Sequence, residues 1–390
     1  MILHSDALKI VLDTGFKTKV EPVSIFESVG RILAEDLIAS FDMPPFNKSM
    51  VDGYACLRND IRSKLILRGV IAAGDKKMSP VEKGICYKIM TGAPVPEGTE
   101  MVVMVEDAVE SANKVEFINP GTSSNIALQG EDFRKGDLIL PKGTLLKPFH
   151  CGIIATLGID EIKVFSMAKV GIMVTGDEIV EPGGKLENGQ IFNANAAQII
   201  NYCRSINCVP RYYGIIPDTL QDTSIALEKG ISENDALIIT GGVSMGDYDY
   251  VSEAIKKSGL EVLFESIAAQ PGRPLIFAKY SDKFCFGMPG NPVSGLVLFE
   301  TIVKPLLMQI MGFNGQKSNI GFKLSESITR KKAQRKSFYP VKLINPEEVE
   351  PIKYNGSAHI NSYSEAFGIL SLEIGEFEKK KGEIVYVRPV

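Results

Sequence analysis

Histidine is scarce in this sequence, and there is no strong excess of either charge. Only His4, His150 and His359 occur in 390 residues, so any chemistry has to rely mainly on carboxylates, hydroxyls, Lys and Arg, backbone groups or a cofactor. The 43 Lys and Arg residues and 47 Asp and Glu residues give a net charge of −4. Such a balance does not favour contact with a nucleic-acid backbone, and no nucleic-acid partner is predicted.

Long hydrophobic runs and closely spaced cysteines are also missing. No uninterrupted run approaches the roughly 18 to 20 apolar residues that span a bilayer, so no membrane association is predicted. The six cysteines include no C-x-x-C pair, which argues against zinc-ribbon and thioredoxin-like sites. We expect reduced, mostly buried thiols. The N-terminus has no signal-peptide pattern, so the expected compartment is the cytoplasm.

A chain of 390 residues is long enough for two to four domains. The apolar spacing from residue 5 to about 37 predicts two helical runs. Residues 64–105 combine short apolar segments with turn residues, which is typical of a small β-rich domain. The apolar run 151–157 ends at Gly158 and predicts a helix with a glycine stop.

From residue 163 onwards, strand and helix patterns alternate. The predicted strands are 170–174, 209–216, 236–240 and 284–288, and the predicted helices are 194–203, 219–229, 250–258 and 293–311. This order predicts a parallel sheet with helices on both faces and a ligand site beyond the carboxyl ends of the strands. After a linker at 312–319, residues 320–390 predict a small β-barrel or sandwich.

Three strand-to-helix turns of the α/β part are rich in glycine. They are VTGDE (174–178), ITGGVSMGDYD (239–249) and GMPGNPVSG (287–295). Glycine lets a ligand approach the backbone, and the N-terminus of the following helix attracts an anion. One such turn is a weak signal, because glycine turns occur in any α/β fold. Three at one sheet edge predict a phosphate-binding pocket.

Carboxylates lie within or beside these turns, namely Asp177, Glu178, Asp218, Asp247 and Asp249. Carboxylates next to an anion site repel the ligand unless a divalent cation lies between them, and hard oxygen donors suit Mg²⁺. The alternative is that Asp247 and Asp249 only cap the next helix or hold a turn. The functional interpretation is favoured for Glu178 and Asp249, whereas the two are balanced for Asp247.

Two loops in the β-rich part mix rigid prolines with polar and apolar residues. They are PPFNKSMVDGYA (44–55) and IMTGAPVPEG (89–98). From their residues alone, both are either turns or binding loops.

Seven motifs in order carry a resemblance to a known family. They are PPFNKSMVDGYA, TGAPVPEGTEMVVMVED, GEDFRKGD, VTGDEIVEPG with GQIFNAN, TGGVSMGDYD, QPGRP and MPGNPVSG, and they span residues 44–295. With them the sequence resembles the molybdopterin molybdenumtransferases, the MoeA family, to which the C-terminal domain of gephyrin is also similar.

The resemblance implies a multidomain α/β plus β fold in four parts. These are an elongated helical and linker domain (1–43 plus 139–165), an inserted β domain (44–138), a parallel-sheet molybdopterin-binding α/β domain (166–312) and a C-terminal β-barrel-like domain (313–390). It also implies a homodimer with the active site at the subunit interface, between the α/β domain of one subunit and the inserted β domain of the other.

The activity implied by the resemblance is insertion of molybdate into adenylylated molybdopterin, with Mg²⁺-dependent release of AMP, in molybdenum cofactor biosynthesis. The implied catalytic residues are Asp52, Thr91, Asp132, Glu178, Asp218 and Asp249, of which Glu178, Asp218 and Asp249 are the implied metal ligands. The implied cofactor-binding residues are Gly176, Gly241, Gly242, Ser244, Arg273, Pro289, Gly290, Asn291, Pro292 and Ser357. A molybdopterin adenylyltransferase is an implied partner.

The sequence departs from the family pattern around the oxyanion. Arg273 replaces a usual lysine, and Gln270 replaces another and so loses a charge. Pro340 follows Tyr339 where many relatives have an arginine after an aromatic residue. Arg335, Lys336 and Ser357 are the candidates to compensate.

Two alternatives to the transferase remain. One is the molybdopterin adenylyltransferase, whose single α/β domain shares the glycine turns but lacks the inserted and C-terminal domains. The other is a non-catalytic, gephyrin-like scaffold, which has no need of carboxylates beside anion-binding turns. The sequence does not distinguish molybdate from tungstate, because both are tetrahedral dianions of similar size.

Overall fold

The computed structural model describes the whole chain except residues 77, 244–249, 316–318, 355 and 357. The chain divides into two compact units. The first contains Met1–Glu35, Lys142–Gly152 and Asp160–Val390, and the second contains Asp36–Pro141 and Ile153–Ile159. The finer division into four parts stays a prediction.

The N-terminal segment contains one helix where two were predicted. Helix α1 (His4–Asp13) buries Ala7 and Val11 as the spacing predicts. The second predicted helical run is wrong: strand β1 (Val20–Ser24) and a 3-10 turn (Ile25–Glu27) replace it. Pro22 lacks the N–H that a helix interior needs. The segment instead pairs antiparallel with β12 (Glu161–Phe165).

The second unit is β-rich, as predicted. Its six-stranded sheet has the order β7-β4-β6-β5-β9-β8. The strands are β4 (Gly53–Cys56), β5 (Leu65–Ile71), β6 (Ile85–Ile89), β7 (Met101–Met104), β8 (Ala108–Ser111) and β9 (Lys114–Phe117). Short pairs join β3 (Lys48–Ser49) with β10 (Ile126–Ala127), and β2 (Leu37–Ile38) with β11 (Leu138–Leu140). Helix α2 (Pro148–Thr156) ends just before Gly158, at φ 72°, so the predicted helix and glycine stop are confirmed.

The first unit contains a six-stranded sheet of order β16-β13-β17-β21-β20-β18. Its parallel part is β16 (Val209–Ile216), β13 (Lys169–Thr175), β17 (Ala236–Thr240) and β21 (Lys283–Met288). The predicted parallel sheet therefore needs one correction. Strands β20 (Pro274–Tyr280) and β18 (Glu261–Ser266) extend it in antiparallel pairing, which makes the sheet mixed.

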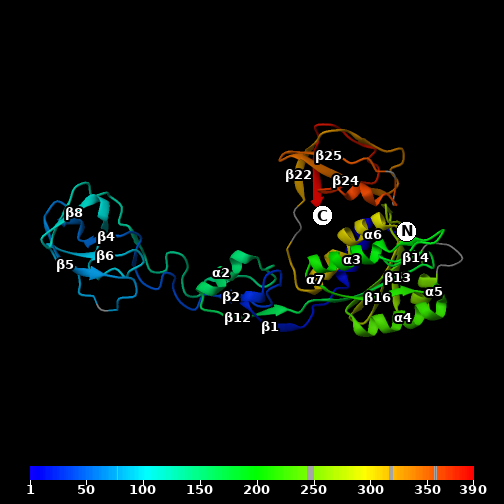
Figure 1. The fold of residues 1–390 in the computed structure, drawn as a ribbon, viewed down its shortest axis with the longest axis horizontal. Helices are drawn as coiled ribbons and strands as arrows, with labels where there is room; N and C mark the ends of the chain where they lie inside the picture. Colours follow the sequence, from blue (N-terminus) through cyan, green and yellow to red (C-terminus); the bar gives the residue numbers. More distant parts are fainter. Residues whose placement is uncertain (77, 244–249, 316–318, 355, 357) are drawn as a thin grey trace. The chain divides into compact units, whose positions relative to one another are not determined.

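Helices cover both faces of this sheet, as predicted (Figure 1). One face carries α3 (Ala194–Ser205), α6 (Pro292–Leu298) and α7 (Lys304–Ile310), and the other carries α4 (Leu220–Glu233) and α5 (Tyr250–Lys257). Side chains alternate along β13, so that Ile172 joins the core on one face and Met173 joins the core on the other. The sheet is thus held between two apolar layers.

A π-helical stretch, Phe299–Val303, joins α6 to α7 and makes one helix over Pro292–Ile310. This helix is apolar and long enough to cross a membrane by length and composition. Glu300 and Lys304 interrupt it, so the expectation that no uninterrupted apolar run approaches this length is not contradicted. In the structure, 83% of its most apolar window is buried, so it is a core helix.

The C-terminal strands close into a barrel, as the β-barrel prediction expected. Strands β24 (Lys336–Asn345), β25 (Glu348–Pro351), β22 (Ile320–Leu324), β28 (Ile384–Pro389) and β26 (Gly368–Leu372) pair in that order, and β26 pairs back onto β24. The short strands are β19 (Ala269–Gln270), which extends this sheet, and β23 (Ile328–Thr329) with β27 (Glu378–Lys379). All six cysteines are free and five are buried, as expected.

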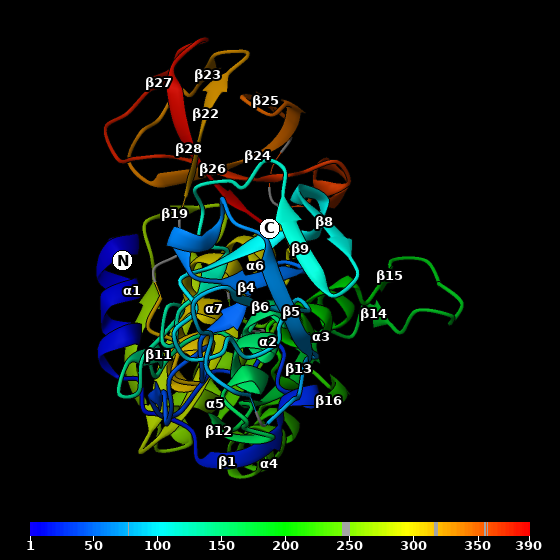
Figure 2. The ribbon, with the colours of Figure 1, turned by 90° about the vertical axis from the view of Figure 1, so that its left-hand side faces the viewer.

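One further pair of short strands lies outside the α/β sheet. Strands β14 (Ile179–Val180) and β15 (Ile191–Phe192) pair in parallel and extend, with the loop between them, away from the sheet (Figure 2).

Candidate active site

A cavity of about 650 Å³ lies at the carboxyl ends of the parallel strands in the first unit, where the ligand site was predicted. Strand β13 ends in it at Thr175, β17 ends at Thr240, and β21 leads into Pro289. The predicted residues around it are Gly176, Glu178, Asp218, Gly241, Gly242, Arg273, Pro289, Gly290 and Asn291. All three glycine-rich turns thus contribute to one cavity.

The backbone of these turns requires glycine at two positions. Gly241 has φ +97°, and a Cβ there would lie 2.3 Å from the carbonyl oxygen of Thr175. Gly176 has φ +141°, and a Cβ there would lie 2.7 Å from the Glu178 carboxylate. Other residues adopt such conformations only with strain. At these two positions the turns therefore present backbone to the cavity.

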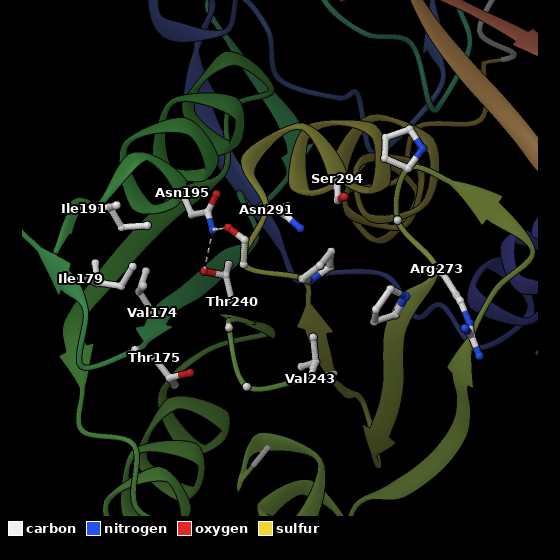
Figure 3. A pocket seen from close by; sticks show the side chains of 18 of the residues that line it. Val174, Thr175, Ile179, Ile191, Asn195, Thr240, Val243, Arg273, Asn291 and Ser294 are labelled. Carbon is white, nitrogen blue, oxygen red and sulfur yellow. Dashed lines mark hydrogen bonds between the residues drawn. The ribbon is translucent and has the colours of Figure 1, made fainter. Parts of the chain in front are cut away.

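Asn195 is a cavity residue that the sequence reading missed. It lies in the first turn of α3, with 9% of its surface exposed. Its Nδ2 donates to the Gly290 carbonyl at 2.7 Å and to Thr240 Oγ1 at 3.3 Å (Figure 3). It therefore connects the second and third glycine turns. A buried amide between two glycine turns holds them in register, and the sequence signal was the Asn-Ala-Asn sequence at the start of the helix.

The acidic side of the cavity is formed by Glu178 and Asp218. The backbone N–H of Asp218 donates to Asp177 Oδ1 at 3.4 Å. Burial, followed by the charges of Asp177 and Glu178, raises the pKa of Asp218. Such a set of oxygen donors is what a divalent cation would neutralise.

The structure does not describe every predicted residue. Asp249, Ser244 and Ser357 fall outside the described residues, as does Asp247. Pro292 occupies the first position of α6 and does not line the cavity. Among the residues that the structure describes, no group of three or more His, Cys, Asp or Glu could hold a metal ion.

The opposite side of the cavity is basic. It includes Arg273 and Arg335, with Gln270 between this cavity and a smaller one of about 280 Å³. The smaller cavity is lined by Gln270, Arg330, Lys331, Lys332, Gln334, Arg335, Ser337 and Tyr339. Among the described residues that line it there is no carboxylate, so the charged side chains of these residues are all positive.

The basic residues in and beside the smaller cavity differ in whether other protein groups already bind them. The Arg330 guanidinium donates to the carbonyls of Glu376 and Arg335, both at 2.6 Å, and so has a structural task. Lys336 is paired with Glu373 at 2.6 Å. Lys331 and Lys332 are exposed, and Arg335 borders both cavities.

The remaining predicted residues, Asp52, Thr91 and Asp132, belong to the second unit. Thr91 and Asp132 line a cavity of about 540 Å³ there. Asp52 Oδ1 accepts hydrogen bonds from the backbone N–H and the hydroxyl of Thr91, both at 2.7 Å. These bonds lower the pKa of Asp52, which keeps the carboxylate ionised.

Comparison with known families assigns nearly the whole chain. Residues 2–158 match the MoeA N-terminal region (domain I and II), residues 171–309 match a probable molybdopterin binding domain, and residues 323–390 match the MoeA C-terminal region (domain IV).

Individual relatives agree over almost their full length. The chain is 33% identical to the molybdopterin molybdenumtransferase of Haemophilus influenzae over 390 residues, covering 98% of this chain and 96% of the relative. It is 32% identical to a putative molybdopterin biosynthesis protein of Methanocaldococcus jannaschii, covering 95% and 92%. A crystal structure of a MoeA protein from Pyrococcus horikoshii superposes with a TM-score of 0.87 at 29% identity, covering both chains completely. The predicted multidomain α/β plus β fold is confirmed.

Proposed function

Because the chain belongs to the MoeA family of molybdopterin molybdenumtransferases and so acts in molybdenum cofactor biosynthesis, we propose that the 650 Å³ cavity inserts molybdate into adenylylated molybdopterin and releases AMP. The observation that carries the proposal is the separation of charge across three glycine turns. Glu178 and Asp218 lie on one side, and Arg273 and Arg335 lie on the other. Such a cavity suits a substrate with a pyrophosphate and an incoming oxyanion.

In this proposal the glycine turns bind the pyrophosphate and the pterin. Gly176 and Gly241 keep the cavity floor free of side chains, so backbone N–H groups can approach phosphate oxygens. Arg273 adds a positive charge at the rim. One water is consumed when the P–O bond of the anhydride breaks and AMP leaves.

We assign the cation to Glu178, Asp218 and Asp249. The raised pKa of Asp218 supports this assignment, because burial and the charges of Asp177 and Glu178 disfavour its ionised form, and a bound cation would favour it. Mg²⁺ bound there would neutralise the developing charge on the leaving phosphate. Glu178 and Asp218 would hold it, and either carboxylate could orient the attacking water.

The molybdate dianion is assigned to the basic side. Gln270 cannot contribute the charge that the family usually has at this position. Arg273 and Arg335 replace it, and Lys331 and Lys332 of the neighbouring smaller cavity add to the positive potential. Lys336 is not part of this set, because Glu373 already pairs with it.

The proposal includes a cytoplasmic homodimer. The partner subunit would contribute Asp52, Thr91 and Asp132, which lie in a different compact unit from the glycine turns. The two hydrogen bonds from Thr91 fix the Asp52 carboxylate in one orientation, as a residue that faces a ligand requires. A molybdopterin adenylyltransferase is the proposed supplier of the substrate.

The test is a reconstitution with adenylylated molybdopterin, molybdate and Mg²⁺. We expect AMP release that depends on molybdate, measured by chromatography. Release of AMP without any dependence on molybdate, or no release at all, would contradict the transferase. The adenylyltransferase alternative predicts instead that ATP and molybdopterin yield the adenylylated product. The scaffold alternative predicts neither reaction.

A further inference from the structure

Tyr212 joins both ends of the segment that carries one wall of the cavity. Its hydroxyl donates to Glu181 Oε1 at 2.5 Å, directly after β14, and accepts from Asn193 Nδ2 at 2.8 Å, directly after β15. Burial, followed by the hydrogen bond to Glu181, raises the pKa of Tyr212, so the phenol remains a donor. Tyr212 itself lies on β16, a strand of the central sheet.

Two backbone hydrogen bonds also link the two ends of this segment, from Ile191 N to the Glu178 carbonyl at 2.9 Å and from Asn193 N to the Val180 carbonyl at 2.8 Å. Asn193 Nδ2 also reaches the Glu181 carboxylate directly, but only at 3.4 and 3.5 Å. Strands β14 and β15 are only two residues long, and a pairing of this length is marginal by itself. Residues 181–189, which follow β14, are all exposed and include Gly183 and Gly189 at positive φ. The segment nevertheless supplies Glu178, Ile179 and Ile191 to the cavity. Its position therefore depends on the contacts at its two ends.

Asn193 links the same contact to the floor of the cavity. Its Oδ1 accepts from Ala196 N at 3.0 Å and caps α3, and its side chain is buried. Asn195, two residues on, holds the second and third glycine turns. The Tyr212 hydroxyl thus lies between the Glu178 wall and the helix that positions these turns.

The next residue on β16, Tyr213, makes the same kind of hydrogen bonds to a Glu and an Asn, but away from the cavity. Tyr213 donates to Glu233 Oε2 at 2.7 Å and accepts from Asn234 Nδ2 at 2.8 Å. Its ring packs against the core on the other face of the sheet, and neither partner lines the cavity. Glu233 also pairs with Arg211. Tyr213→Phe is therefore a matched control for Tyr212→Phe, because each variant loses a tyrosine hydroxyl that is hydrogen-bonded to a Glu and an Asn.

We propose that Tyr212 is a positioning residue that, through Glu181 and Asn193, holds the 178–193 segment and thereby places Glu178 for cation binding. The proposal rests on the proposed function for the role of Glu178. Tyr212 touches no substrate atom. Its loss should therefore change the position of the segment that carries Glu178 more than it changes the chemical step. Tyr212→Phe removes the hydroxyl and retains the ring, so any effect of this substitution is due to the hydroxyl.

The first experiment does not depend on activity. Lys185 lies in the exposed loop, so trypsin cleaves after it when the segment opens, and mass spectrometry identifies the 1–185 fragment. We expect Tyr212→Phe to accelerate this cleavage about fivefold to tenfold, because cleavage follows the population of the open form. Tyr213→Phe should leave the rate within about twofold of wild type, even if both variants lose similar thermal stability.

The second experiment measures AMP release against Mg²⁺ concentration. Tyr212→Phe should raise the Mg²⁺ concentration for half-maximal rate about tenfold, in the range seen when groups supporting a metal ligand are removed. Tyr213→Phe should not change it. Glu181→Gln keeps an acceptor for the phenol and should behave as wild type, whereas Glu181→Ala should behave as Tyr212→Phe.

Equal trypsin cleavage in the two tyrosine variants would overturn the proposal, as would an unchanged Mg²⁺ dependence in an active Tyr212→Phe protein. If wild type releases no AMP, the proposed function fails, but the cleavage comparison still decides whether Tyr212 holds the segment. Near-additive effects of Tyr212→Phe and Glu181→Ala would also count against it, because residues acting through one contact are coupled.

Discussion

At the scale of single residues, Gly241 shows how closely the turns of the cavity are packed. It has φ +97°, and a Cβ would meet the backbone of Thr175, which no side-chain rotation can relieve. We predict that Gly241→Ala destabilises the α/β domain by about 3 kcal/mol or more and abolishes substrate binding. Gly259→Ala is the control, because its φ is +79° but nothing lies within 4 Å of a Cβ. It should cost about 1 kcal/mol. Thermal unfolding of both variants measures the difference.

Asp218 carries a prediction about pH. Its raised pKa in the folded protein means that its contribution to stability is complete below its ordinary pKa of 3.8 and is lost as pH rises through the folded value. Asp218→Asn should therefore raise the Tm of the metal-free protein at neutral pH, and the difference should disappear under acid conditions. The same variant should lose most AMP release. If Asp218→Asn lowers the Tm at pH 7 without Mg²⁺, the electrostatic account is wrong.

Glu178 lines the same cavity as Asp218 and is a proposed ligand of the cation. Glu178→Gln keeps the size of the side chain but removes the charge that a cation requires. We expect molybdate-dependent AMP release to fall by about 10² or more, with little change in Tm. Glu187→Gln, in the exposed loop, is the matched control and should retain full activity. Normal turnover by Glu178→Gln would remove this residue from the site.

At the scale of elements, two helical Glu–Lys pairs with the same spacing differ in burial. Glu300 is 1% exposed and contacts Lys304 at 2.7 Å, whereas Glu253 and Lys257 on α5 are about half exposed. Glu300→Ala leaves a poorly solvated ammonium and should destabilise by about 3 kcal/mol. Glu253→Ala should change stability by about 0.5 kcal/mol or less. Comparable Tm values for the two variants would contradict this reading of burial.

Elements bounded by strong local signals could be predicted from the sequence. Strands 209–216 and 236–240 were predicted with the bounds that β16 and β17 have, and residues 236–239 are a continuous apolar run that leads into the glycines at 241 and 242. The prediction of a second helical run was wrong. Val23, Phe26 and Val29 have helical spacing, but the pairing of β1 with β12 determines the structure. Strands β18 and β20 were missed, although their antiparallel partners lie close in the sequence: Ser266 pairs with Pro274, and Tyr280 pairs with Lys283.

The cavity could be predicted in part for the same physical reason. Glycine turns at strand ends can be recognised from the local sequence. Gly176, Gly241 and Gly290 were identified in this way, and all three line the cavity. Asn195 and Tyr212 act through contacts with residues far along the chain, which no local pattern contains. The acids of the second unit were identified only through the resemblance to the family.

At the scale of the whole molecule, the small net charge of −4 conceals a strong local separation. Carboxylates line one side of the cavity, and arginines and lysines line the other side and the smaller cavity next to it. Net charge therefore says little about ligands here, because the binding potential arises from a few residues around backbone turns. A shortage of histidine is compatible with the proposed chemistry, since carboxylates and a cation supply it.

The proposed homodimer leads to a prediction about mixed subunits. If each active site combines Asp52 of one subunit with Glu178 of the other, then Asp52→Ala and Glu178→Gln are each inactive as homodimers. A mixed dimer contains one site with both defects and one site with neither. Coexpression of the two variants should therefore restore about a quarter of wild-type AMP release, because half of the dimers are mixed and each has one intact site. Light scattering checks that dimers are present. Dimers without recovery of activity would show that Asp52 and Glu178 do not share a site across the interface.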